Sequence, residues 1–130
     1  MSHVRQLDGK GELEWRTEPV PADLDPNARH AFVFPAAMGY VSQPSGTFTL
    51  SLGGTKLLDF DVSLASRTWK SEDTSVILAY AARASNAEDT TGLVTLDVPA
   101  KFLEPGKPAV LKVVGSNIGS RRWFGLLPLR

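Results

Sequence analysis

The sequence predicts an all-β domain: a two-sheet antiparallel β-sandwich of jelly-roll type with about eight strands. Three observations predict it. Apolar residues recur at every second position, Gly and Pro interrupt the chain at short intervals, and no helical apolar stripe is found. Because 130 residues suit one domain, residues 1–130 are expected to form a single sandwich. Both ends lie close to predicted strands, which indicates a domain excised from a longer chain.

The first two strands are expected at residues 13–17 and 31–34. In the first strand, apolar residues alternate with charged ones, so one of its faces should be solvated. Each strand is followed by a proline, Pro19 and Pro35 respectively, which cannot donate a hydrogen bond to a ladder. We therefore expect both strands to end there, with a polar loop over residues 22–30 between them.

The next two strands form the clearest unit, residues 46–64. A three-residue Gly-Gly-Thr loop at 53–55 pairs Phe48 with Phe60. A two-residue Gly-Gly turn would instead pair Phe48 with Asp59 and place a carboxylate in the core. Since register follows the buried face, the pattern predicts the longer loop.

Further strands are expected at residues 76–84, 94–98, 109–114 and 123–127, with polar loops at 65–74 and 85–91. The 76–84 strand is apolar on both faces. Such a strand is either central and covered on both sides, or has an outer face that meets another domain or subunit.

Composition narrows the function classes. The 14 basic and 14 acidic residues balance, which argues against nucleic acid as a partner because phosphate binding needs excess positive charge. The absence of cysteine excludes disulfides and thiolate metal sites. No apolar run approaches the roughly 20 residues of a membrane span, and the N-terminus carries no apolar leader.

The candidate ligand-binding residues centre on the 65–74 loop. Trp69 stands in this loop between Arg67 and Lys70. An exposed Trp ring matches the apolar face of a pyranose, while neighbouring polar groups bind its hydroxyls. The alternative is that Trp69 folds back into the end of the sandwich, since Trp is usually largely buried.

Two further residues extend the candidate site. Arg83 ends the 76–84 strand and either reaches a ligand at the same rim or is simply solvated. Tyr40 stands near Gln43 in a polar loop that forms a second aromatic patch or an ordinary connection. Trp15 and Trp123 are expected in the core.

No catalytic motif is present: there is no nucleophile elbow, phosphate loop, dinucleotide fingerprint or zinc-protease helix. The two histidines are His3 and His30, and nothing in the pattern recommends either as a base. Asp59 and Asp61 lie on a predicted outer face, which is unsuited to a carboxylic acid whose pKa must be raised. No catalytic residue is therefore assigned.

No cofactor or metal ligand is assigned either. Asp23, Asp25 and Asn27 have the opening spacing of a calcium loop. However, Pro26 interrupts it, Ala28 stands where the turn glycine belongs, and a phenylalanine stands where the closing glutamate belongs.

Two segments carry a family resemblance. The stretch 98–114, VPAKFLEPGKPAVLKVV, resembles a strand–turn–strand near the end of galactose-binding-like jelly rolls. The stretch 46–58 looks like another strand of that family, with Gly53-Gly54 replacing its Asn-Gly. These domains accompany glycoside hydrolases and other carbohydrate-active enzymes, often with a structural calcium, and many only pack against a catalytic domain.

The resemblance implies a non-catalytic accessory module of a larger enzyme, secreted to an extracellular or periplasmic site, that binds carbohydrate or packs on a neighbouring domain. The alternative from a different class is a protein-interaction or structural module without sugar binding. A small free-standing enzyme is the third hypothesis, and it would need a polar pocket holding perturbed carboxylates or His30.

Overall fold

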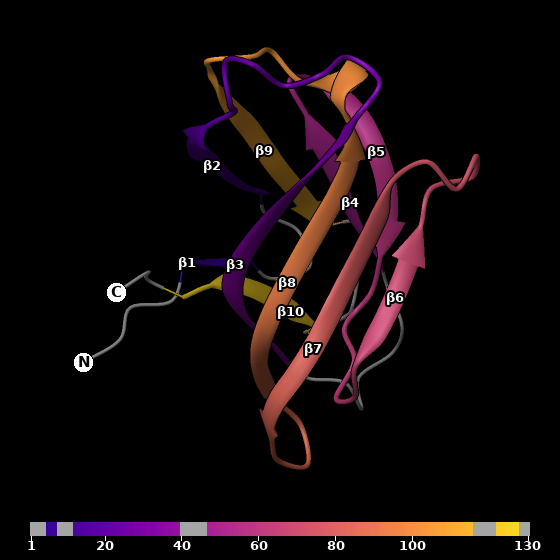
Figure 1. Cartoon of the computed structure of the whole chain (residues 1–130). Coiled ribbons are helices and arrows are strands. Elements are labelled where there is room, and N and C mark those ends of the chain that lie inside the picture. Colours follow the sequence, from indigo (N-terminus) through magenta and orange to yellow (C-terminus); the bar gives the residue numbers. More distant parts are fainter. Residues whose placement is uncertain (1–4, 8–11, 40–46, 116–121, 128–130) are drawn as a thin grey trace.

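The computed structural model describes residues 5–7, 12–39, 47–115 and 122–127. Two antiparallel sheets pack face to face (Figure 1). The six-stranded sheet has the order β1 (Arg5–Leu7), β10 (Trp123–Leu126), β3 (Arg29–Gly39), β8 (Thr90–Pro99), β7 (Ile77–Ser85), β6 (Arg67–Lys70). The four-stranded sheet has the order β2 (Glu12–Pro19), β9 (Pro108–Gly115), β4 (Phe48–Leu52), β5 (Thr55–Phe60). A 3₁₀ turn, η1 (Ala100–Phe102), follows β8. The predicted all-β sandwich is confirmed.

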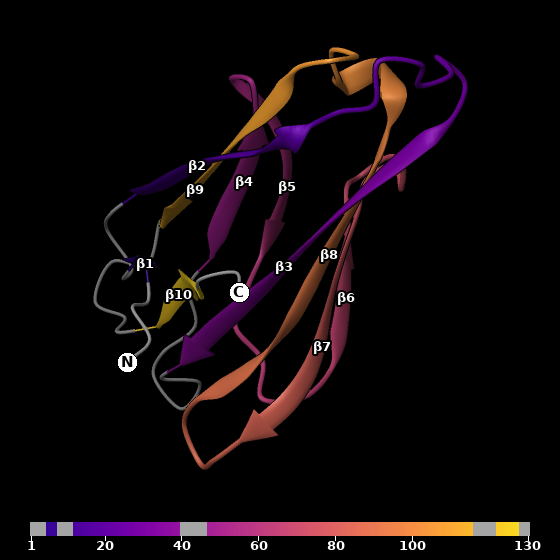
Figure 2. The same ribbon diagram turned by 60° about the vertical axis from the view of Figure 1, so that its left-hand side comes forward.

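The topology combines nested pairs and simple hairpins. The pairs β2–β9 and β3–β8 lie in opposite sheets, as in the outer turns of a jelly roll (Figure 2). Inside them, β4–β5 stays within the four-stranded sheet and β6–β7 within the six-stranded sheet. Strands β5 and β6 are therefore the edge strands on one open side of the sandwich.

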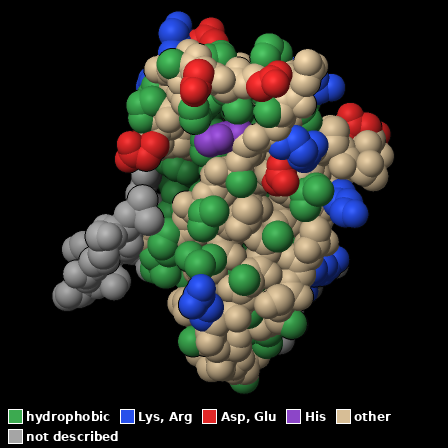
Figure 3. Space-filling view, viewed as in Figure 1, with side chains coloured by type: hydrophobic (Ala, Val, Ile, Leu, Met, Phe, Trp, Pro, Cys, Tyr) green, Lys and Arg blue, Asp and Glu red, His purple; other side chains and the backbone are tan. Residues whose placement is uncertain are grey.

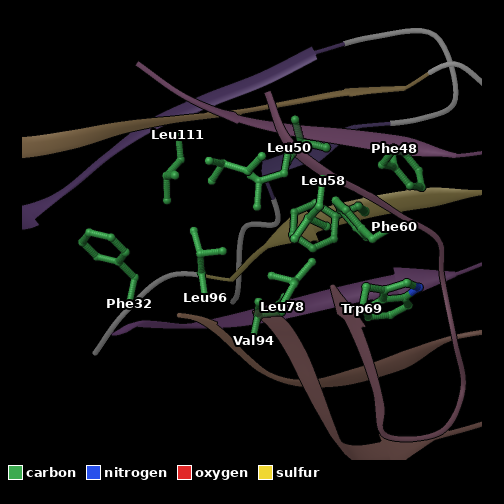
Figure 4. Packing of buried hydrophobic residues seen from close by; sticks show 14 of the residues in the cluster. Phe32, Phe48, Leu50, Leu58, Phe60, Trp69, Leu78, Val94, Leu96 and Leu111 are labelled. Atoms are coloured by element: carbon green, nitrogen blue, oxygen red, sulfur yellow. The ribbon is translucent and has the colours of Figure 1, made fainter. Parts of the chain in front are cut away.

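The core consists of alternate residues from both sheets (Figure 4). Phe48, Leu50 and Leu111 of the four-stranded sheet and Leu96 of the six-stranded sheet are at most 1% exposed. Burying one such side chain stabilises a fold by about 1.5–3 kcal/mol relative to exposing it. The period-two pattern thus correctly identifies the inner face of each sheet.

The β4–β5 hairpin has the predicted register but a different turn. Phe48 pairs with Phe60, and the two rings lie 5.5 Å apart. The turn nevertheless contains only Gly53 and Gly54, whose φ angles of 57° and 87° suit the two-residue turns that favour hairpins. Ser51 pairs with Lys56 and Leu50 pairs with Leu58, so Leu57 is an extra residue on β5. This bulge shifts the register by one residue and brings the apolar side chains of the two strands back to the same face.

The prediction that Pro35 ends the second strand is wrong. Strand β3 continues to Gly39 and pairs with β8 from Arg29 to Met38. The carbonyl of Pro35 accepts from Leu127 N, and the N and O of one strand residue face the same neighbour. The missing N–H therefore faces Leu127, one residue beyond the end of β10, and this end of the ladder is a position that tolerates proline.

Candidate functional site

Trp69 does not lie in an exposed loop, as one interpretation of the sequence proposed. Residues 67–70 form β6, and pairing of Trp69 with Leu78 turns the indole toward the core, where it is 9% exposed. Its ring lies edge-on to Phe60 at 5.8 Å, and the Arg67 guanidinium lies 5.1 Å from its centroid. Because only 9% of Trp69 is exposed, too little of its ring reaches solvent to act as a stacking platform.

The other predicted ligand residues do not converge on one site. Lys70 ends β6 and lines a groove described below. Arg83 is exposed at a register shift of β7. Lys70 pairs with Ile77, and Arg83 lies six residues further along the same strand, which is a distance of about 20 Å. Tyr40 and Gln43 lie outside the described residues. Trp15 and Trp123, expected in the core, are half-buried at its margin.

A groove of about 480 Å³ lies on the open side of the sandwich. It lies where the edge strands β5 and β6 meet η1 and the β6–β7 turn, which projects at the upper right in Figure 1. The lining residues are Lys56, Leu57, Leu58, Asp59, Lys70, Ser71, Glu72, Asp73, Ser75, Val76 and Phe102. Its volume lies within the range of roughly 300–1,000 Å³ usual for small-ligand sites.

The floor of the groove is apolar. Leu57, Leu58 and Val76 are buried beneath it. Phe102 of η1 is half-buried and packs against the core while still lining the groove. The Lys101 ammonium lies 5.3 Å from the centre of the Phe102 ring. The groove therefore offers a ligand an aromatic surface next to a cation.

The β6–β7 turn holds a carboxylate in a fixed position. Asp73 Oδ1 accepts from Ser71 Oγ at 2.7 Å, from Ser75 Oγ at 2.7 Å and from Ser75 N at 3.0 Å. These bonds, foremost that from the Ser75 hydroxyl, lower the pKa of Asp73 from 3.8 to about 2. Thr74 completes the turn with a positive φ of 61°. Asp73 is therefore an ionised acceptor at any ordinary pH.

The opposite wall carries a second fixed carboxylate. Asp59 accepts from Thr49 Oγ1 at 2.7 Å and pairs with Lys56 at 3.1 Å. The Thr49 hydroxyl is the main cause that lowers the pKa of Asp59. A general acid in glycoside hydrolysis needs the opposite shift, toward a raised pKa. Asp61 pairs with Arg122 at 3.1 Å and is only 23% exposed, which corrects its expected place on a solvated outer face.

A second surface contains a region without charged side chains. The outer side of the six-stranded sheet, facing the viewer in Figure 3, presents the cross-strand rows Ala31–Asp97–Ile77–Lys70, Val33–Thr95–Ala79–Thr68 and Pro35–Leu93–Ala81. We call the seven residues of the last two rows the uncharged face. Val33 within it is 56% exposed. Strand β7 is thus interior in its sheet, but nothing in the described chain covers its outer side.

The outer side of the four-stranded sheet is different. Its cross-strand rows carry the charged residues Glu12, Glu14, Arg16, Lys56, Asp59 and Lys112. Lys112 pairs with Glu12 at 3.0 Å. This side is an ordinary solvated surface. The uncharged face therefore belongs to the six-stranded sheet and has no counterpart in these rows of the four-stranded sheet.

Two further features are absent from the described residues. Across the described residues, no three His, Cys, Asp or Glu side chains are placed to hold a metal ion. In the Asp23–Asn27 segment, Asp25 Oδ1 instead accepts from Asn27 N at 2.8 Å. The part of the chain that the structure describes also contains no helix long and apolar enough to cross a membrane.

Comparisons with known proteins add little. No protein-family model and no curated protein sequence matches this chain. Among solved structures, the chain is similar to the CspB protease of Clostridium perfringens, with 12% sequence identity and a TM-score of 0.42. The match covers 97% of this chain and 25% of the protease chain, so this chain spans about a quarter of that protein's length. Such a distant likeness informs neither the fold nor the activity.

Proposed function

We propose that this chain is a non-catalytic carbohydrate-binding module whose site is the groove between β5, β6 and η1. The observation that carries the proposal is the position of Phe102, a half-buried aromatic ring at the floor of a hollow walled by ammonium and carboxylate groups. An aromatic ring packs against the apolar face of a pyranose, while the charged groups bind its hydroxyls. The resemblance of residues 98–114 to galactose-binding-like domains supports the same function.

Calorimetric or NMR titration with a panel of oligosaccharides tests this proposal. Fluorescence is unsuitable because Trp69 is buried and no Trp lines the groove. Phe102→Leu keeps an apolar side chain but removes the ring, and Lys70→Ala removes a donor. We expect each to weaken binding by about tenfold, the loss of roughly 1.4 kcal/mol of contact energy.

Lys112→Ala on the opposite sheet is the matched control for Lys70→Ala and should leave binding unchanged. Absence of binding across the whole panel would refute the proposal. Equal losses in Lys70→Ala and Lys112→Ala would place the site elsewhere.

A second candidate function is a protein-interaction module, which the uncharged face favours. A surface that combines Val33, Pro35 and Leu93 with small side chains can pack against another protein without desolvating a charge. Val33→Lys and Ala81→Lys would introduce charges there, and they should abolish an association that sedimentation of the unmodified chain detects. A chain that remains monomeric and that binds no added catalytic domain would contradict this candidate.

A further inference from the structure

Two ammonium groups and three carboxylates line the groove, and a third ammonium lies beside it. Three ammonium groups, Lys56, Lys70 and Lys101, and three carboxylates, Asp59, Glu72 and Asp73, lie on or beside its walls. Lys101 does not line the groove but lies beside it, because its Nζ is 5.3 Å from the centre of the Phe102 ring, which does line it.

Opposite charges are also neighbours within the groove. Lys56 and Asp59 form an ion pair at 3.1 Å on the β5 wall. Asp73 and Lys101 influence each other across the turn, and Lys70 and Glu72 are two residues apart at its start. Each of the two walls therefore carries both signs of charge.

This arrangement has a consequence for ligand choice. A carboxylate or ammonium on a ligand would gain attraction from half of these groups and repulsion from the other half. A neutral hydroxyl can accept from an ammonium and donate to a carboxylate, so a polyol forms charge-assisted hydrogen bonds with both. We infer that the groove selects uncharged saccharides over uronic acids and amino sugars. This inference rests on the proposed carbohydrate-binding function and specifies its ligand class.

Calorimetry with the whole chain and three matched probes tests the inference: a neutral cello-, xylo- or galacto-oligosaccharide, an oligogalacturonate and a chitosan oligomer. We expect the neutral probe to bind at least about tenfold more tightly than either charged probe. Its Kd should also change by less than about twofold between low and high salt, because a neutral ligand carries no charge whose attraction to the groove salt could screen.

Charge variants make the test sharper. Glu72→Lys gives the groove an excess of positive charge and should gain binding of oligogalacturonate. Lys70→Glu gives it an excess of negative charge and should gain binding of the chitosan oligomer. Glu18→Lys makes the same charge change on β2, at the far edge of the four-stranded sheet, and should gain neither.

The outcomes separate the two proposals. If the unmodified chain binds a charged probe more tightly than the neutral one, the selectivity is refuted while carbohydrate binding stands. If Glu72→Lys and Glu18→Lys behave alike, charge in this groove does not govern selection and the inference fails. If no probe binds the unmodified chain, the proposed function itself fails.

Discussion

At the scale of single residues, Thr90 shows how the core accommodates polar groups. It is 2% exposed, and its Oγ1 lies 3.1 Å from the Tyr80 hydroxyl and 3.0 Å from Ser85 Oγ. Ser85 Oγ in turn donates to the Leu64 carbonyl. Each buried hydroxyl therefore has a partner, as buried polar groups require.

Thr90→Val tests this network because it replaces the hydroxyl with a methyl group of similar size. The Tyr80 hydroxyl would be left buried without its partner, which costs about 1–3 kcal/mol in the free energy of unfolding. Urea denaturation measures the loss. Tyr80→Phe in the same chain should recover part of it, and a fully additive double variant would show that the two hydroxyls do not interact.

Asp73 predicts a pH dependence of stability. Its pKa is about 2 in the folded chain, below its ordinary value of 3.8, so the unfolded state takes up the proton first as the pH falls. The contribution of Asp73 to stability is therefore complete above about pH 4 and is lost between about pH 4 and 2. Denaturation at several pH values checks this, and Asp73→Asn should have a flatter profile in that range. An unchanged profile would mean that the turn does not stabilise the fold.

At the scale of elements, the strand edges are protected against unwanted pairing. Strand β6 has only four residues, of which the first is Arg67 and the last is Lys70. Strand β5 carries Lys56 beside its register shift. Short strands, bulges and lysines all discourage edge-to-edge association. Because these features prevent further strands from pairing with β5 and β6, this side of the sandwich stays open, and the groove lies there.

The β7–β8 pair depends on a glycine. A Cβ built on Gly92 would lie 2.1 Å from the Ala81 carbonyl oxygen, at the register shift of β7. Gly92→Ala should therefore force the two strands apart and destabilise the chain by at least about 1–3 kcal/mol. Gly53→Asn is the control, because nothing lies within 4 Å of a Cβ there and Asn tolerates its φ of 57°. Similar thermal denaturation of both variants would contradict the expected clash.

At the scale of the whole molecule, stability comes from one interior shared by the two sheets, whereas their outer sides are available for recognition. The interior is closely filled, and its apolar cavity measures only about 10 Å³. Of the outer sides, one is charged and the other carries the uncharged face. Binding functions are therefore expected at the open edge or on the uncharged face, without cost to the core.

Leu96→Ala and Val33→Ala distinguish interior from outer side on neighbouring strands. Leu96 is 0% exposed between the sheets, so its truncation should cost about 2–5 kcal/mol through lost burial and a new cavity. Val33 is 56% exposed, and its truncation should change the free energy of unfolding by no more than about 0.5 kcal/mol. Denaturation curves that rank the two variants otherwise would show that the uncharged face is covered in solution.

The sequence alone determined the sandwich and much of its pairing. Period-two alternation records which side of each strand meets water, and for Phe48 and Phe60 this was enough to set the register, although not the turn length. The sequence did not predict that Phe102 and the Ser71–Ser75 turn would line the candidate site. A phenylalanine that follows a strand, or a turn of polar residues, is not by itself a sign of ligand binding. The Ser-x-Asp-x-Ser spacing marks a fixed turn at most.

Only the tertiary structure decided what depends on neighbours distant in the chain. It placed Trp69 inside by pairing it with Leu78, it carried β3 past Pro35 where β10 ends, and it brought β5, β6 and η1 to one open side. Local sequence patterns indicate which face of its own strand a side chain lies on, and whether that face is buried. They do not report which strands become edges or which segments meet, because long-range pairing between the sheets determines both.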